Sequence, residues 1–95
     1  MPAYVVSVVN VKNPEQYQKY AVLAPAAIAK QGGRFLARGA IHETLEGGLG
    51  ANRVVVTEFP SLEKAKAFYH SAEYQAARLN RLGAADFTMM LLEGL

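Results

Sequence analysis

The chain contains no cysteine among its 95 residues. It therefore has no disulfide framework, no thiol nucleophile and no cysteine-based metal site. Lysine and arginine are not clustered and the formal net charge is only +2, so we expect neither a nucleic acid nor a membrane surface as a partner. The apolar run at the N-terminus is too short and too alternating to span a bilayer, and it does not have the form of a cleavable leader. These absences predict a soluble, cytoplasmic protein.

Signals for cofactors are also scarce. The glycine-rich stretch 47–50 lacks the Lys-Ser/Thr that follows in a phosphate-binding loop, and no dinucleotide fingerprint is present. The histidines, His42 and His70, lie 28 positions apart without a carboxylate at ligand spacing. We therefore expect no metal, no flavin and no haem, and a protein that purifies colourless.

The length and the apolar content together favour an oligomer. A chain of 95 residues forms one domain, 1–95, and buries only about 60–65% of its unfolded surface. The apolar fraction of 52% is high for this size, so a subunit interface is the expected place for the surplus.

The first half of the chain predicts a strand, a helix and a second strand. Residues 3–11 are rich in β-branched residues and apolar on both parities, as in a central strand. Asn13-Pro14-Glu15 predicts a helix start, and Pro25 predicts a kink rather than two helices. Gly32-Gly33 predicts the helix end, because glycine enters the left-handed region at least cost.

The second half predicts two strands around a pair of helices. Ser61 and Ser71 each precede a helical pattern and are predicted N-caps; the alternative for Ser71, a nucleophile, has no visible histidine and acid partner. These two strands are expected at 53–59 and 86–93; the second strand of the chain is expected at 34–45, with 47–50 as a hairpin loop before the third.

The order βαββαβ predicts an α+β fold of the ferredoxin-like kind, with a four-stranded antiparallel sheet and helices on one face. Strands 3–11, 53–59 and 86–93 carry apolar residues on both parities, so the second face also requires burial. Two such sheets packed face to face would form a homodimer with room for a pocket.

Four segments resemble the small bacterial family called domain of unknown function 1330 (DUF1330). They are Asn-Pro-Glu-x-Tyr-x-x-Tyr at 13–20, Gly-Gly-Arg-Phe-Leu-Ala-Arg-Gly at 32–39, Glu-Phe-Pro-Ser at 58–61 and Tyr-x-Ser-x-x-Tyr-Gln at 69–75. That family is placed in the dimeric α+β barrel superfamily, beside cofactor-independent monooxygenases, muconolactone isomerase-like proteins and haem-degrading enzymes. The resemblance implies a homodimer with a cleft between sheet and helices, but it transfers no reaction.

One position departs from the family pattern. His70 stands where the family usually has an acidic residue, and the haem-binding relatives place a histidine on a helix near this point. The alternative, an exposed histidine near a helix end, agrees better with the absence of a second ligand.

A candidate catalytic group lies on the second and third predicted strands. Arg38 and His42 are four residues apart on one strand and share a face, and Glu58 turns to that face if Phe59 points to the helices. Arg38 would bind an anionic group, and His42 or Glu58 would move a proton. The alternatives are a structurally satisfied ion pair and a contact of the dimer interface.

Tyrosines supply the candidate ligand-binding wall. Tyr69 and Tyr74 can direct hydroxyls into a pocket, although such residues are more often core tyrosines with one satisfied hydroxyl. Arg34, Arg53 and Arg78 are interpreted as solvated surface charges. The sequence therefore leaves two functions open: a cofactor-independent enzyme, monooxygenase- or isomerase-like, for a small anionic or aromatic compound, or a non-enzymatic binding or assembly module.

Overall fold

The computed structural model of the protein describes residues 1–39, 42–48 and 50–95. Its described part has the predicted order of elements, with each predicted helical connection divided into two helices. In chain order the elements are β1 (Ala3–Val11), α1 (Pro14–Ala21), α2 (Ala24–Lys30), β2 (Arg34–Gly39), β3 (Arg53–Phe59), α3 (Leu62–His70), α4 (Ala72–Leu79) and β4 (Ala85–Glu93).

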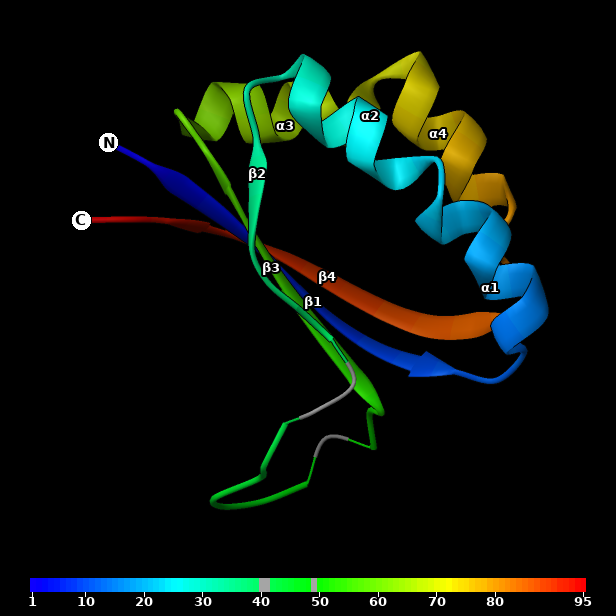
Figure 1. Ribbon diagram of the computed structural model, residues 1–95. Coiled ribbons are helices and arrows are strands. Elements are labelled where there is room, and N and C mark those ends of the chain that lie inside the picture. Colours follow the sequence, from blue (N-terminus) through cyan, green and yellow to red (C-terminus); the bar gives the residue numbers. More distant parts are fainter. Residues whose placement is uncertain (40–41, 49) are drawn as a thin grey trace.

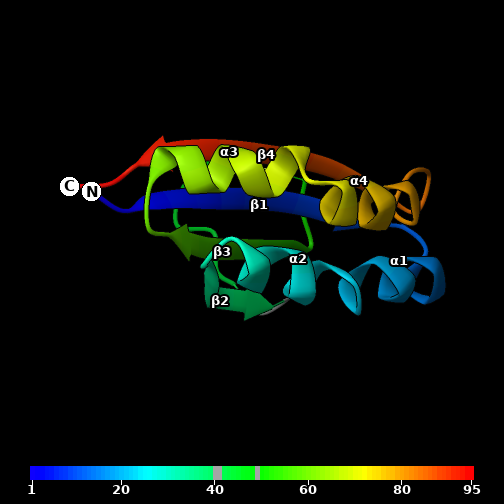
Figure 2. The same ribbon diagram turned by 90° about the horizontal axis from the view of Figure 1, so that it is seen from above.

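The strands form one antiparallel sheet in the order β2-β3-β1-β4. The helices of the described part lie on the same side of this sheet (Figure 1). Seen from above, α3 lies over β1 and β4, and α2 lies on the side of β2 and β3 (Figure 2). The predicted ferredoxin-like α+β arrangement is therefore confirmed.

β1 is central because it is apolar on both faces. Its odd-numbered residues from Ala3 to Val9 point to the helices and are buried. On the opposite face Val6 is paired with Val56 of β3 and with Met90 of β4. In a single chain no described element covers this opposite face, where Met90 is 50% and Leu92 59% exposed. The predicted apolar second face is thus present and uncovered.

The first helical connection breaks into two helices, so the prediction of a single kinked helix is wrong. α1 begins as predicted, because the Asn13 side chain accepts a hydrogen bond from the Gln16 N–H. α1 ends at Ala21, and α2 begins at Ala24 with Pro25 in its first turn. Proline is favoured in a first turn because its missing N–H has no partner there. In the described part no helix is long and apolar enough to cross a bilayer.

A pair of glycines ends α2 as predicted. Gly32 has φ +77°, a conformation that other residues adopt at a cost. Gly33 is required for another reason, since a Cβ there would lie 2.5 Å from Cε1 of Phe59. The start of β2 therefore packs directly on the core.

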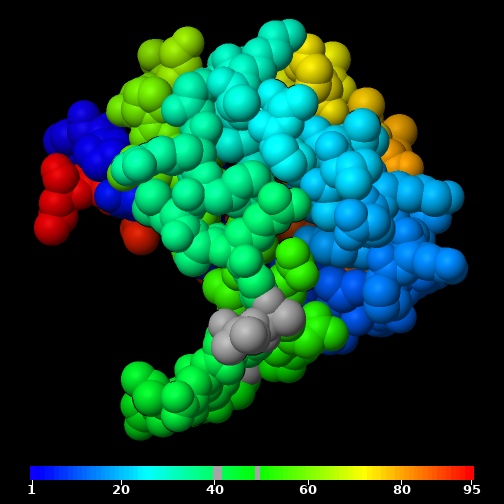
Figure 3. Space-filling view, in the orientation of Figure 1, coloured from blue at the N-terminus to red at the C-terminus, as the bar shows by residue number. Residues whose placement is uncertain are grey.

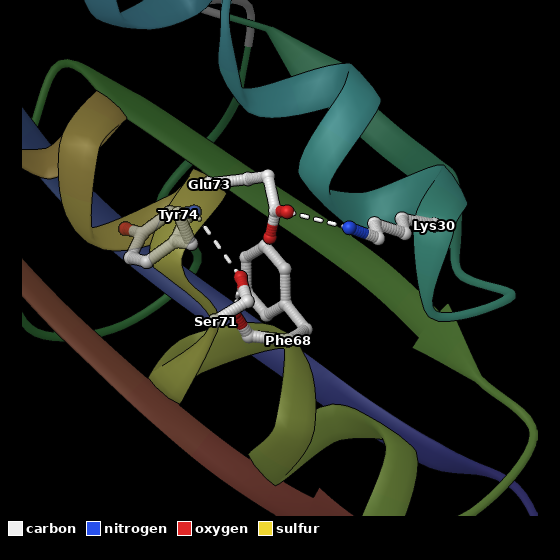
Figure 4. Close-up of polar contacts among 5 residues, drawn as sticks. All are labelled: Lys30, Phe68, Ser71, Glu73 and Tyr74. Atoms are coloured by element: carbon white, nitrogen blue, oxygen red, sulfur yellow. Dashed lines mark hydrogen bonds and ion pairs between the residues drawn. The ribbon is translucent and has the colours of Figure 1, made fainter.

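Ser71 joins the other two helices and confirms its predicted capping role. Its hydroxyl donates to the Phe68 carbonyl at 2.7 Å and accepts from the Tyr74 N–H at 3.1 Å (Figure 4). One side chain thus satisfies the end of α3 and the start of α4. An ion pair between Lys30 and Glu73 ties α2 to α4 beside this turn (Figure 4).

Candidate functional site

The helix-facing side of the sheet and helices α1 and α2 enclose a space that we call the inner cleft. Figure 3 looks into its mouth, between the green surface of β2 and the blue surface of α1. The free volume inside is about 30 Å³, enough for one or two water molecules. Most of the lining is apolar, and its polar side chains are Ser7, Tyr17, Tyr20, Arg38, Arg53 and Thr57.

Arg38 stands at the mouth of the inner cleft. Its guanidinium donates to the Ala21 carbonyl at 3.2 Å and lies 4.5 Å from the centre of the Phe35 ring. Pro25 has no N–H to donate to the carbonyl four residues earlier, which is that of Ala21. The helix break thus supplies the acceptor that anchors Arg38.

Arg53 lies deeper, at the start of β3. It is paired with Val9 of β1 and therefore points to the helices, where its guanidinium lies 5.6 Å from the centre of the Tyr17 ring. Its Nε is buried and has no hydrogen-bond partner among the residues that the structure describes. Since an unpaired buried donor is costly, this N–H favours a ligand that supplies an acceptor.

A buried chain of hydrogen bonds forms the back of the site. Tyr20 and Tyr74 have their hydroxyl oxygens 3.0 Å apart, and Nη2 of Arg81 lies 3.3 Å from the Tyr74 oxygen. Arg81 is only 7% exposed, and its guanidinium stacks 3.9 Å from the centre of the Phe87 ring.

The direction of each hydrogen bond in this network follows from which groups can donate. Arg81 can only donate, so the Tyr74 oxygen accepts from it. Tyr74 is fully buried, and among the described residues the Tyr20 oxygen is the acceptor available to the Tyr74 proton. The proton of Tyr20 is then left for the inner cleft, which Tyr20 lines.

Both cleft tyrosines keep their protons at neutral pH. Burial raises the pKa of Tyr17 above its ordinary value of 10.0, against the opposing effect of Arg53 and Arg38. Burial, followed by the charge and the hydrogen bond of Tyr74, raises the pKa of Tyr20 well above the same value. Each phenol is therefore a hydrogen-bond donor rather than a base.

The positive charge of the site has no acidic counterpart in the described part of the chain. None of the residues that line the inner cleft is Asp or Glu. Ion pairs among the described residues lie elsewhere, between Lys12 and Asp86, Lys30 and Glu73, and Arg34 and Glu58. Low-dielectric walls around unpaired cations raise the local concentration of anions.

The predicted pairing of Arg38 with Glu58 is wrong, because the two residues lie on opposite faces of the sheet. Glu58 is paired with Arg34, whose Nε lies 2.9 Å from its carboxylate. The register shifts by a β-bulge between Phe35 and Ala37. This extra residue turns Arg38 to the helix side, whereas regular alternation would have placed it on the same face as Glu58.

The other predicted site residues lie outside the inner cleft, and their roles stay predictions. His42 is exposed in the connection from β2 to β3, which extends away from the helices (Figure 1). The expected second strand, 34–45, is shorter, since β2 ends at Gly39 and residues 42–45 are not strand; residues 40 and 41 lie outside the described part. Tyr74 is buried behind Tyr20, and Tyr69 stacks on it with ring centres 5.5 Å apart.

Sequence reasoning missed Arg53 and Arg81. Arg53 was expected in solvent, but it shares its parity with Val55 and Phe59 on the helix-facing side of β3. The alternation of side chains along β3 was the sequence signal that could have placed Arg53 on the helix-facing side. Among the described residues no group of three or more His, Cys, Asp or Glu side chains is placed to hold a metal ion.

Several solved structures share this fold. A protein of unknown function from Rhodopseudomonas palustris superposes with a TM-score of 0.78 at 21% identity, over 99% of this chain and 82% of its own. A dimeric ferredoxin-like protein of unknown function from Jannaschia sp. CCS1 gives a TM-score of 0.74 at 11% identity, over 99% and 100%. The cofactor-independent oxygenase SnoaB from Streptomyces nogalater gives 0.72 at 12% identity, over 99% and 93%. At these identities the likeness shows the fold alone.

The family can be assigned from the sequence of the whole chain. No protein of curated function matches it. The family model described as Domain of unknown function (DUF1330) matches residues 2–95, in agreement with the resemblance seen in the four segments above. The chain therefore belongs to the DUF1330 family.

Proposed function

We propose that the protein binds a small organic anion in the inner cleft, with the anionic group between Arg38 and Arg53. The observation that carries this proposal is a cleft lined by two guanidinium groups and by no carboxylate. Guanidinium groups form strong, directional hydrogen bonds with carboxylates and related anions. The Tyr20 hydroxyl donates to an oxygen of the same ligand.

The volume of the inner cleft limits the part of the ligand that enters it. About 30 Å³ accommodates the anionic group and little more. The body of the ligand then lies at the mouth, against Phe35 and the stem of Arg38. A small carboxylate is therefore the simplest probe of the site.

The inner cleft presents cationic and hydroxyl hydrogen-bond donors, as a site that stabilises an oxyanion does. Negative charge that develops on an oxygen of the ligand would gain stabilisation from the guanidinium groups and from the Tyr20 O–H. The similarity of fold to a cofactor-independent oxygenase supports this reading. The alternative is a binding module without turnover; His42 and Glu58 have no part in the proposal, because neither lines the inner cleft.

We also propose that the protein is a homodimer, formed by the uncovered apolar face of the sheet. Strands β1, β3 and β4 contribute this face through Val6, Val56, Met90 and Leu92. A partner sheet would bury it, as in other face-to-face packings. The structural neighbour described as a dimeric ferredoxin-like protein supports this assembly.

The binding proposal is tested with propionate and its neutral counterpart propionamide. The titration follows the Nε–H resonance of Arg53 by NMR, since this N–H has no hydrogen-bond partner in the described part of the chain. We expect saturable shifts with propionate and much weaker shifts with propionamide. Equal responses to the two compounds, or none to propionate, would contradict the proposal. Mass spectrometry of small molecules released from the freshly purified protein then identifies the natural anion.

A further inference from the structure

A second hollow lies outside the inner cleft, between α3 and β4. Figure 2 shows α3 running along β4 at this edge of the sheet. The free volume of this α3–β4 hollow is about 300 Å³, which is ten times that of the inner cleft and within the range of small-molecule pockets.

The floor and walls of the α3–β4 hollow are apolar and polarizable. Phe87, Met89 and Leu91 of β4 lie along one side, and Tyr69 of α3 closes the other. Thioether sulfurs and aromatic rings make favourable contacts with a flat aromatic ring. These surfaces favour an aromatic ligand over a flexible aliphatic chain.

The rim of the hollow carries a lysine and a histidine and no carboxylate. Lys66 and His70 are four residues apart on α3, so they lie on one side of that helix. Both side chains are exposed, and among the described residues neither takes part in an ion pair. No Asp or Glu lines the hollow. An anionic group on the ligand would therefore meet Lys66 and His70 without competition from a carboxylate.

We infer that the α3–β4 hollow binds an aromatic carboxylate, with its ring on Met89 and Leu91 and its carboxylate between Lys66 and His70. This site is separate from the inner cleft in its charged groups, and it shares with the cleft only the floor residues Val5, Phe87 and Met89. Its occupancy does not depend on the function proposed above.

The test is a titration of the full chain with 2-naphthoate, followed by the methyl resonances of ¹³C-labelled methionine. Met90, on the edge strand β4, borders the α3–β4 hollow as well as the opposite face of the sheet and does not line the inner cleft. Met89 lines both spaces, and the exposed Met1 lines neither. We expect saturable shifts of Met89 and Met90 and none of Met1. The neutral 2-naphthamide and the aliphatic decanoate are expected to bind more weakly.

Substitutions of the exposed Lys66 and His70 locate the bound anion. Lys66→Ala and His70→Ala are each expected to weaken binding about two- to fivefold, as for an exposed charge contact. Lys64→Ala, an exposed lysine of the same helix outside the hollow, and Arg53→Gln in the inner cleft are expected to leave binding unchanged.

Three results would overturn the inference. The first is binding that Lys66→Ala and His70→Ala leave unchanged, and the second is equal affinity for 2-naphthoate and either comparison compound. The third is loss of binding in Arg53→Gln, which would place the naphthoate in the inner cleft and leave the function proposed there intact.

Discussion

The Arg38 guanidinium donates a hydrogen bond to the Ala21 carbonyl, which lies at the end of α1. This carbonyl is open to a side chain because the residue four positions later, Pro25, has no N–H. A break in a helix and a bulge in a strand thus meet at one contact. Together they fix a cation at the mouth of the inner cleft.

The glycine pair gives a prediction about stability. Gly33→Val should lower the free energy of unfolding by more than ~1 kcal/mol, because its side chain would overlap Phe59 and Ile28. Gly32→Val should also cost more than ~1 kcal/mol, because a β-branched residue resists a positive φ. Urea denaturation measures both. Gly48→Ala is the control, since nothing lies within 4 Å of its Cβ position, and an equal midpoint for all three variants would contradict the account.

Tyr74→Phe should destabilise the protein by about 1–3 kcal/mol, because it leaves Arg81 and Tyr20 without a buried partner. The matched control is Tyr17→Phe. No hydrogen bond of the Tyr17 hydroxyl is found among the described residues, so this variant should change stability little. Chemical denaturation of the two variants compares them, and equal losses would refute a special role for the buried hydrogen-bond chain.

Stability should fall in alkaline solution. The folded state raises the pKa of Tyr17 and Tyr20, mainly through burial, while the unfolded chain keeps values near 10. Above that pH the unfolded chain loses protons that the folded protein retains, so the free energy of unfolding decreases as pH rises. Below pH ~10 the contribution is fully present. Urea midpoints between pH 8 and pH 11 test this (the range follows the ordinary phenol pKa), and Tyr20→Phe should flatten the decline.

The uncovered sheet face predicts a dimer, and a single charged side chain introduced on this face should dissociate it. In sedimentation experiments at micromolar concentration, the protein should exceed its chain mass of 10.3 kDa. Val56→Glu should return it to the monomer, because an unpaired carboxylate would be buried between two apolar sheets. Ala26→Glu, on the exposed surface of α2, should leave the dimer intact. A wild-type protein of 10.3 kDa would argue against the interface.

The fold followed from the sequence because its signals are local. Asn13, Ser61 and Ser71 each cap a helix as predicted, and Gly32 adopts the predicted positive φ. The break before Pro25 was misread as a kink, since proline fits both the interior bend of a helix and the first turn of a new one.

The candidate site was less accessible to sequence reasoning. Regular alternation along β2 would put Arg34 and Arg38 on one face, but the bulge after Phe35 reverses the face of Arg38. The position of a bulge depends on how one strand pairs with its neighbour, and the sequence of β2 alone does not indicate it. Arg81 follows α4, and its burial depends on Phe87 of β4 and Tyr74 of α4, which come together only in the folded chain. For Arg53, charge alone had suggested a solvated position.

The central claim is that the inner cleft binds an anion through Arg38, and two arginines on the same strand test it directly. Arg34 and Arg38 both belong to β2, but Arg34 pairs with Glu58 on the opposite face. Affinity for propionate, measured by NMR titration, should fall roughly tenfold in Arg38→Gln, as for a lost charge-assisted hydrogen bond. Arg34→Gln should bind propionate as the wild type does. Equal affinity in Arg38→Gln and the wild type, or a loss confined to Arg34→Gln, would contradict the account.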